Sequence, residues 1–180
     1  MEFLECVSGR RSVRKYKSEP VPDALLKKIV GAAALAPSWK NTQTTRYMVV
    51  RDRALMDYIG DNCVLGLEWN QKILRGAPAV IFVTTITGRA GFERDGSFST
   101  SKGTHWESFD AGIATQTLCL AAYNEGLATV IIGVFDEEKI AERVSIPEGQ
   151  RLSALVAIGF PDETPDMPKR KGTEDLLTIM

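Results

Sequence analysis

The sequence predicts a domain of the α/β or α+β class, because stretches with helical periodicity alternate with short apolar runs. Apolar side chains repeat at helical spacing over residues 23–35. Residues 78–84 form a continuous apolar, β-branched run, which indicates a central buried strand. Two further runs, 129–132 and 152–159, have the same character. This alternation leaves the choice between the two classes open.

The first half of the chain contains two helices, a loop and two strands in this reading. Residues 1–8 form a short amphipathic helix, and the helix at 23–35 is stopped by Pro37. Residues 36–43 have the composition of a loop. A strand at 47–50 and a helix that begins after Asp52 lead to the central strand at 78–84.

The second half begins with a long loop and ends in a tail. Residues 88–104 are rich in glycine, serine and charge, which predicts a mobile and functional loop. The helix at 107–124, capped by Gly126, is apolar on nearly every face, so we expect it in a core or at a subunit interface. A helix from Asp136 to Val144 separates the last two strands. The tail 162–180 cannot fold alone, and we expect it to lie along another part of the assembly, such as a partner subunit.

Composition excludes several classes of protein. The 180 residues, 44% of them apolar and 25% charged, suit one domain spanning 1–180 without a linker. Lys and Arg number 22 against 23 Asp and Glu, so no broad basic field is available for nucleic acid.

Cysteine and histidine usage argues against a metal site. Cys6, Cys63 and Cys119 form no CxxC pair, and His105 is the single histidine. Neither a signal peptide nor a run of about 18 apolar residues is visible. We therefore expect a cytoplasmic protein without membrane contact.

Two basic clusters are candidates for binding one anion. Arg10, Arg11, Ser12 and Arg14 combine guanidinium forks and a hydroxyl, which match phosphate oxygens. The alternative is a solvated basic turn. The cluster Lys169-Arg170-Lys171 lies far away in the sequence, and both clusters are best explained if they converge on the same ligand.

Other polar residues have both a functional and a structural interpretation. Ser38, Asn41 and Gln43 can read the edge of a heterocycle, or they can serve turn chemistry. Gly133 either lets a ligand approach the backbone or forms an ordinary strand-to-helix turn. The absence of a Gly-x-Gly-x-x-Gly fingerprint disfavours a Rossmann fold. Asp110 is interpreted as a structural hydrogen-bond acceptor.

Taken in order, these motifs resemble those of the FMN-dependent nitroreductase family. The resemblance rests on Arg-Arg-Ser-x-Arg at 10–14, Ala-Pro-Ser-x-x-Asn-x-Gln at 36–43, Glu-Gly-Leu at 125–127 and Ile-Gly-x-Phe-Asp at 132–136. It implies an α+β sandwich around a central, mostly antiparallel sheet. It also implies an intertwined homodimer with FMN at the interface, the tail embracing the partner, and no nucleic-acid partner.

The resemblance also assigns roles to residues. Phosphate and ribityl contacts fall to the N-terminal cluster and the tail cluster, and a cation near flavin N1 and O2 falls to Lys72. Contacts to the other subunit's flavin come from Pro37, Ser38, Trp39 and Asn41, and contacts near N5 come from Ile132 and Gly133. The implied cofactor-binding residues are Arg10, Arg11, Ser12, Arg14, Pro37, Ser38, Trp39, Asn41, Lys72, Ile132, Gly133, Lys169, Arg170 and Lys171.

The implied activity is ping-pong electron transfer from NAD(P)H through flavin N5 to a small acceptor, such as a nitroaromatic or a quinone, which needs no catalytic side chain. Gln43 is followed by Thr44-Thr45 where the family has Pro-Trp, and Gly133-Val134 stands where larger members have Glu-Gly. Flavin fragmentation, reductive dehalogenation and non-catalytic flavin binding remain alternatives.

Overall fold

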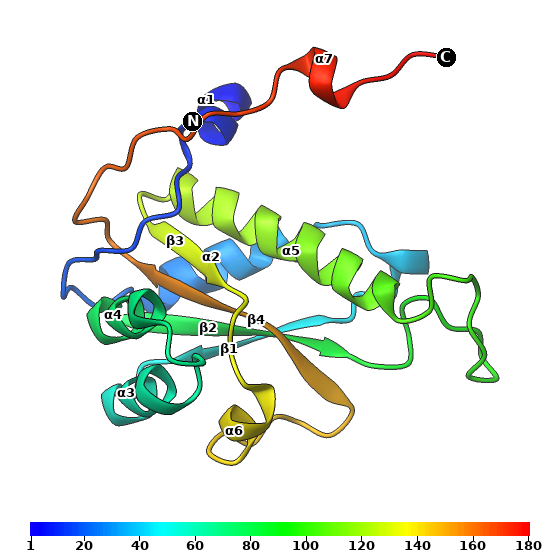
Figure 1. The fold of residues 1–180 in the computed structure, drawn as a ribbon, viewed down its shortest axis with the longest axis horizontal. Coiled ribbons are helices and arrows are strands. Elements are labelled where there is room, and N and C mark those ends of the chain that lie inside the picture. Colours follow the sequence, from blue (N-terminus) through cyan, green and yellow to red (C-terminus); the bar gives the residue numbers. More distant parts are fainter.

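The computed structural model describes all 180 residues and has one four-stranded sheet at its centre (Figure 1). The strands are β1 (Thr45–Val50), β2 (Ala79–Ile86), β3 (Ala128–Ile132) and β4 (Gln150–Gly159). Their order is β1-β2-β4-β3, and every neighbouring pair is antiparallel. The α+β class and the antiparallel character of the sheet are thereby confirmed.

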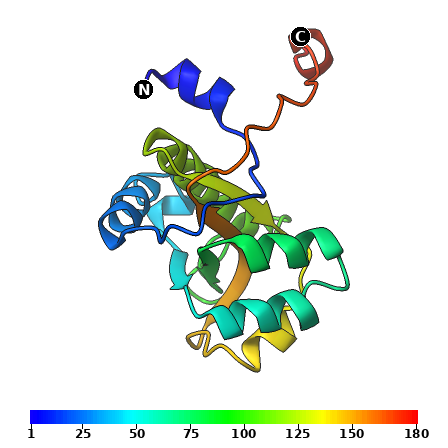
Figure 2. The same ribbon diagram turned by 90° about the vertical axis from the view of Figure 1, so that its left-hand side faces the viewer.

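Helices cover both faces of this sheet, which makes the sandwich. The helical elements are α1 (Phe3–Gly9), α2 (Asp23–Ala33), the 3-10 helix η1 (Trp39–Asn41), α3 (Arg53–Asn62), α4 (Glu68–Gly76), α5 (His105–Asn124), α6 (Glu137–Ala141) and α7 (Thr173–Leu176). On one face, Ile29 of α2 and Leu118 of α5 pack with Ile81 and Val156. On the other, α3 and α4 pack against the side chains of β2 and β4 that point the opposite way (Figure 2). This two-sided burial explains why β2 is apolar along nearly its whole length.

The local signals place most element boundaries within a few residues. Asp52 caps α3, since its carboxylate accepts the Leu55 N–H at 2.8 Å, and Asp136 caps α6 by accepting the Lys139 N–H at 3.1 Å. Gly126 ends α5 at φ 76°, the left-handed conformation expected of a helix C-cap.

Three elements differ from the sequence expectation. The helix α4 was not predicted, because it is short and its N-cap residue, Leu67, provides no capping side chain. The helix α6 ends at Ala141 and not at Val144. The loop 36–43 contains the turn of 3-10 helix η1.

The loop 88–104, predicted to be mobile, is folded on itself in the structure, and its mobility stays a prediction. Phe92 and Phe98 pair across it, with ring centroids 4.9 Å apart. The Ser99 N–H donates to the Gly91 carbonyl at 2.9 Å, which closes the loop. Its first residue, Gly88, donates its N–H to Glu107 of α5 at 2.7 Å. The loop is therefore a compact unit tied to the start of α5.

Both ends of the chain project from the body of the molecule (Figures 1 and 2). The apolar side of α1, formed by Phe3, Leu4 and Val7, is exposed to solvent. In the tail, Leu176, Leu177, Ile179 and Met180 are exposed as well. No helix combines the length and the apolar composition needed to cross a membrane.

Candidate functional site

The N-terminal basic cluster runs as an extended segment beside the sheet. Ser12 forms a parallel bridge with Thr129 of β3, and the Val13 N–H donates to the Thr129 carbonyl at 3.1 Å. Val13 turns into the core, where it is 6% exposed. Because side chains alternate along an extended segment, Ser12 and Arg14 point away from the core on either side of Val13.

The three arginines of this cluster differ in their contacts. Arg11 is turned back on its own chain, since its Nη1 donates to the carbonyls of Ser8 at 2.5 Å and Arg10 at 2.8 Å. Arg10 lines a cavity of about 340 Å³. Its Nε is buried without a hydrogen-bond partner. A buried guanidinium nitrogen without a partner is costly, so it marks a place where an anionic acceptor would be stabilising.

Arg14 meets Lys72, which belongs to a distant part of the sequence, in one cavity of about 530 Å³. Lys72 lies on α4, and Trp69, one turn earlier, lines the same cavity. The Lys72 Nζ stands 5.7 Å from the centre of the Trp69 ring, a cation–π contact. The structure therefore brings together two of the expected positive charges.

Gly133 lies next to α4 on the other side of this region. The Asn70 side-chain amide of α4 donates to the Val134 carbonyl at 3.4 Å, which ties the helix to the turn after β3. A side chain at Gly133 would meet no protein atom within 4 Å, so the backbone there faces open space. Ile132 is 3% exposed and packs in the core, so only its backbone is available to a ligand.

The loop with Pro37, Ser38, Trp39 and Asn41 lies elsewhere in the same chain. Its Trp39 N–H contacts Asp110 in the first third of α5, whereas Gly9 packs on Tyr123 near the end of α5. At 1.5 Å per residue these two points of α5 are about 20 Å apart. One chain does not bring this loop to Arg10 and Arg14.

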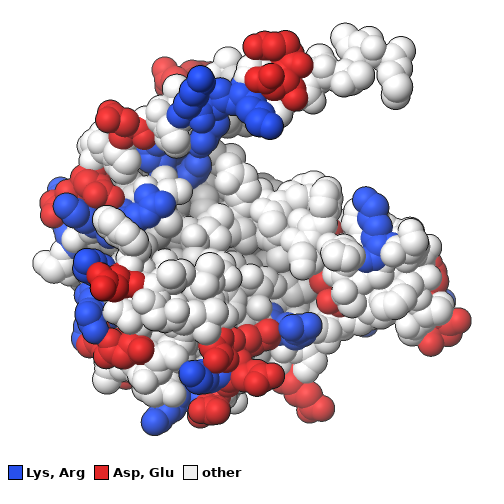
Figure 3. Space-filling view, viewed as in Figure 1, with Lys and Arg blue, Asp and Glu red and all other residues white.

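The tail cluster makes no ion pair or side-chain hydrogen bond with the N-terminal cluster. Lys169, Arg170 and Lys171 are exposed, and none forms an ion pair or a side-chain hydrogen bond. Figure 3 shows Lys and Arg gathered on the projecting tail and along one side of the molecule, while the centre of this face carries few charges.

No side chain in this region has the environment of an activated nucleophile. Burial raises the pKa of the Cys63 and Cys119 thiols, which keeps both protonated. Burial also raises the pKa of Tyr16 far above its ordinary value, and its hydroxyl donates to the Val13 carbonyl at 2.6 Å. What the site offers is open backbone and the positive side chains of Arg14, Lys15 and Lys72, opposed in the same cavity by Asp162 and Glu163.

Sequence reasoning missed Trp69, Asn70 and Glu163. Trp69 and Asn70 lie on the unpredicted helix α4, and Glu163 contacts Arg14 from the beginning of the tail. The available signal was the spacing of Trp69 and Lys72, three residues apart, which places the two side chains on one face of a helix.

Comparison with known proteins places the chain in a family. The family model described as "Nitroreductase family" matches residues 7–68 and 64–160. A protein of Methanothermobacter thermautotrophicus, provisionally named NADH dehydrogenase/NAD(P)H nitroreductase, is 32% identical over 98% of this chain and 83% of its own length. The iodotyrosine deiodinase of Nematostella vectensis is 25% identical over 99% of this chain and 70% of its own length.

A solved structure supports the fold. The crystal structure of a provisionally identified nitroreductase from Exiguobacterium sibiricum, in complex with FMN, superimposes with a TM-score of 0.84. The match covers 100% of this chain and 98% of that chain, at 22% identity. The superposition shows that the two chains share a fold. The family model and the archaeal relative show that this chain belongs to the nitroreductase family.

Proposed function

We propose that the protein is an FMN-dependent NAD(P)H oxidoreductase that reduces a small organic acceptor, such as a nitroaromatic or a quinone. The observation that carries this proposal is the shared cavity of Arg14 and Lys72, beside the open backbone of Gly133. The unpartnered Arg10 Nε supports it, because a phosphate oxygen would satisfy that nitrogen.

The residues of the site fit the chemical parts of FMN. Arg10, Ser12 and Arg14, with Arg11 beside them, would hold the phosphate and the ribityl chain. Lys72 would place positive charge near N1 and O2, where it favours an anionic reduced ring. The backbone of Ile132 and Gly133 would lie near N5. Lys169, Arg170 or Lys171 would close on the phosphate from the tail.

FMN, when bound, supplies hydride acceptance from NAD(P)H at N5 and subsequent donation to the acceptor, a ping-pong sequence. The protein's part is to bind the ring system, to set its charge environment and to exclude water. Initial rates over several NAD(P)H and acceptor concentrations test this sequence. Parallel double-reciprocal lines are expected, and intersecting lines would contradict it.

The proposal includes a homodimer. The outward side of α5 carries Phe109, Ile113 and Gln116 without a charged residue among them, and Figure 3 shows few charges where α5 lies. Together with the exposed apolar side of α1 and the tail, this surface needs a partner. A second subunit would bring Pro37, Ser38, Trp39 and Asn41 to a flavin that their own chain cannot reach, with the tail 162–180 embracing the partner.

We place the protein in the cytoplasm as part of the same proposal. Cys6, Cys63 and Cys119 are all free and buried, as expected in a reducing compartment.

Reductive dehalogenation is the second candidate, because an iodotyrosine deiodinase is among the relatives. It uses the same cofactor site and differs in the acceptor. Single-turnover reactions of the chemically reduced holoenzyme with a nitroaromatic, a quinone and an iodinated tyrosine separate the two. Iodide release faster than nitro or quinone reduction would favour the dehalogenase. A bound flavin that NADH and NADPH both fail to bleach would instead indicate a flavin-binding dimer without activity.

A further inference from the structure

The loop Ser38–Gln43 has a backbone that its own residues do not favour. Lys40, Asn41 and Gln43 have φ values of 44°, 55° and 49°, in the left-handed region that favours glycine. Asparagine tolerates this region, but lysine and glutamine seldom adopt it. Such strain persists only where surrounding contacts fix the conformation, and it gathers at functional sites. The contacts that hold this loop therefore bear on its role.

Several of these contacts are local or exposed. The Ser38 Oγ accepts the Gln43 N–H at 3.0 Å, and the Arg46 Nη1 donates to the Gln43 carbonyl at 2.7 Å. The ion pair between Lys40 and Glu93, at 3.0 Å, joins two side chains that are about half exposed. Exposed ion pairs add little rigidity. These contacts shape the loop without anchoring it to the core.

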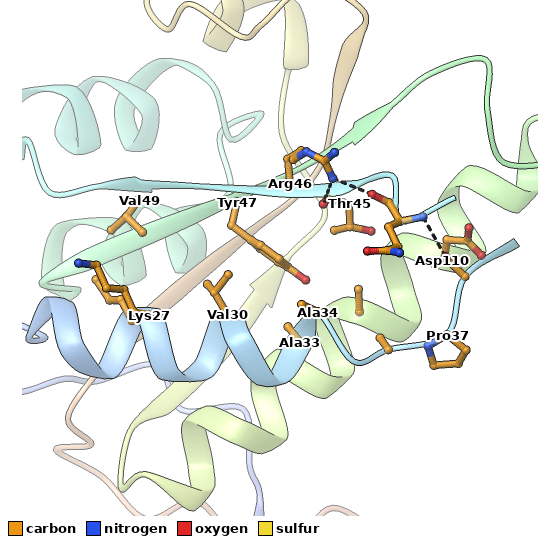
Figure 4. Close-up of a pocket in the computed structure, with 15 residues that line it drawn as sticks. Lys27, Val30, Ala33, Ala34, Pro37, Thr45, Arg46, Tyr47, Val49 and Asp110 are labelled. Atoms are coloured by element: carbon orange, nitrogen blue, oxygen red, sulfur yellow. Dashed lines mark hydrogen bonds between the residues drawn. The ribbon is translucent and has the colours of Figure 1, made fainter. Parts of the chain in front are cut away.

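Two side chains of α5 hold the loop: the Trp106 ring packs on the Trp39 ring, with centroids 4.5 Å apart, and the buried Asp110 binds the Trp39 backbone. Its two carboxylate oxygens accept the Trp39 N–H at 2.9 Å and 3.1 Å. Asp110 lies on α5 and is 2% exposed. Figure 4 shows it pointing from α5 toward the part of the chain that follows Pro37. No cation forms an ion pair with this carboxylate, and its hydrogen bonds come from Trp39 alone.

A carboxylate is a poor choice for stability at this position. Burying it with one backbone donor is unfavourable, and burial raises the pKa of Asp110 against the opposing effect of the Trp39 N–H. Ala111, Ala114 and Leu118 are equally buried on the same helix and carry no such cost. The advantage of the carboxylate is a stronger and shorter hydrogen bond than a neutral acceptor makes. The residue type therefore favours a rigid loop over a more stable core.

We infer that Asp110 is a positioning residue, which holds the strained loop Ser38–Gln43 so that Trp39 and Asn41 are presented to the flavin site of a second subunit. This inference rests on the proposed function. It adds that the backbone of the cross-subunit loop is fixed from within the donating subunit by the hydrogen bond between Asp110 and Trp39, beside the packing of Trp39 on Trp106.

Two substitutions separate the hydrogen bond from the rest of the side chain. Asp110→Leu keeps the size and removes the acceptor, whereas Asp110→Asn keeps an acceptor oxygen and removes the charge. Glu93→Gln is the matched control, because it neutralises the other carboxylate that contacts this loop. FMN affinity of each dimer is measured by fluorescence titration, together with the absorbance spectrum of the bound flavin and amide hydrogen exchange at Trp39.

The account predicts that the folded Asp110→Leu dimer binds FMN at least tenfold more weakly than wild type, with a shifted flavin spectrum. The FMN affinity of Asp110→Asn should lie within about threefold of the wild-type value. The FMN affinity of Glu93→Gln should lie within about twofold of it. The Trp39 amide should be strongly protected in wild type and in Asp110→Asn. An Asp110→Leu dimer with the FMN affinity and flavin spectrum of wild type would overturn the inference. Fast amide exchange at Trp39 in the wild-type protein would also overturn it. This second measurement tests the inference even if Asp110→Leu does not fold. Failure of the wild-type protein to bind FMN would instead overturn the proposed function.

Discussion

The Glu163 carboxylate accepts the backbone N–H of Arg14 at 2.7 Å, so a negative charge stands inside the basic cavity proposed for the phosphate. The contact also fixes the beginning of the tail beside the N-terminal segment, where the Asp162 N–H donates to the Lys15 carbonyl at 3.0 Å. Glu163 thus orders the chain while opposing an anionic ligand. The two effects can be separated, because glutamine accepts the same hydrogen bond without the charge.

We predict that Glu163→Gln binds FMN about two- to fivefold more tightly than wild type. Removing a half-exposed like charge contributes up to about 1 kcal/mol. Titration of the apo-protein with FMN, followed by fluorescence quenching, measures the change. Glu138→Gln, which removes an exposed charge from α6, is the control and should have no effect. Weaker binding by Glu163→Gln would show that Glu163 does not face the phosphate.

The double variant Arg10→Ala/Arg14→Ala should fold and lose its FMN. Each charged hydrogen bond to the phosphate contributes about 1.5–3 kcal/mol. Flavin content and circular dichroism are measured on the purified protein. The variant Lys17→Ala/Arg94→Ala removes two positive charges outside the cavities lined by Arg10 and Arg14 and should keep its flavin. Full FMN occupancy in Arg10→Ala/Arg14→Ala would refute the assignment.

We predict an obligate homodimer that depends on the tail. Sedimentation at low micromolar concentration should give about twice the chain mass of 19.8 kDa. A chain that ends after Pro168 should dissociate or lose affinity for FMN, because it lacks the exposed apolar end and the tail cluster. A flavin-loaded monomer of the full chain would contradict both the dimer and the cross-subunit role of Ser38 and Asn41.

The loop 88–104 is predicted to set acceptor choice without affecting FMN binding. Phe92 and Phe98 pack against each other with tilted rings, so alanine at both positions loosens the loop from within. We expect unequal changes in kcat/KM across a panel of quinones and nitroaromatics, with a smaller change in flavin reduction by NAD(P)H. An unchanged acceptor profile would show that the loop is only a surface feature.

Tyr47→Phe should keep or raise stability. The Tyr47 hydroxyl is buried in the cavity between α2 and β1 without a hydrogen-bond partner, and burial raises its pKa to about 12 (Figure 4). Because the unfolded chain ionises near pH 10 and the folded one near pH 12, tyrosine lowers stability as the pH rises through that window. Thermal unfolding of both proteins between pH 8 and pH 11 should show a smaller alkaline loss for Tyr47→Phe. Lower stability of Tyr47→Phe at pH 8 would indicate that a group of the second subunit bonds this hydroxyl.

The sequence predicted candidate site residues where they form short local motifs, namely Arg10–Arg14, the loop 36–43 and Ile132-Gly133. The apolar runs of β2 and β4 predicted the centre of the sheet. The meeting of Lys72 with Arg14 is tertiary, and the helix that carries Lys72 lacks a capping signal, so its presence was not foreseen.

The contact of Asp110 is a second tertiary feature that the sequence predicted only in part. Its role as a hydrogen-bond acceptor was predicted, but its partner was not. The partner is a backbone N–H in a loop where residues other than glycine adopt left-handed backbone conformations. Backbone strain of this kind leaves no signature in the residue types. The contacts of the tail with a second subunit likewise cannot be predicted from the sequence of one chain.

The measurement that tests the central claim most directly is the visible absorbance spectrum of the purified protein before and after anaerobic addition of NADH or NADPH. The account predicts a yellow protein with about one FMN per chain, whose flavin absorbance is bleached by at least one of the two donors and restored by a quinone. A colourless protein that takes up no FMN on reconstitution would contradict the account.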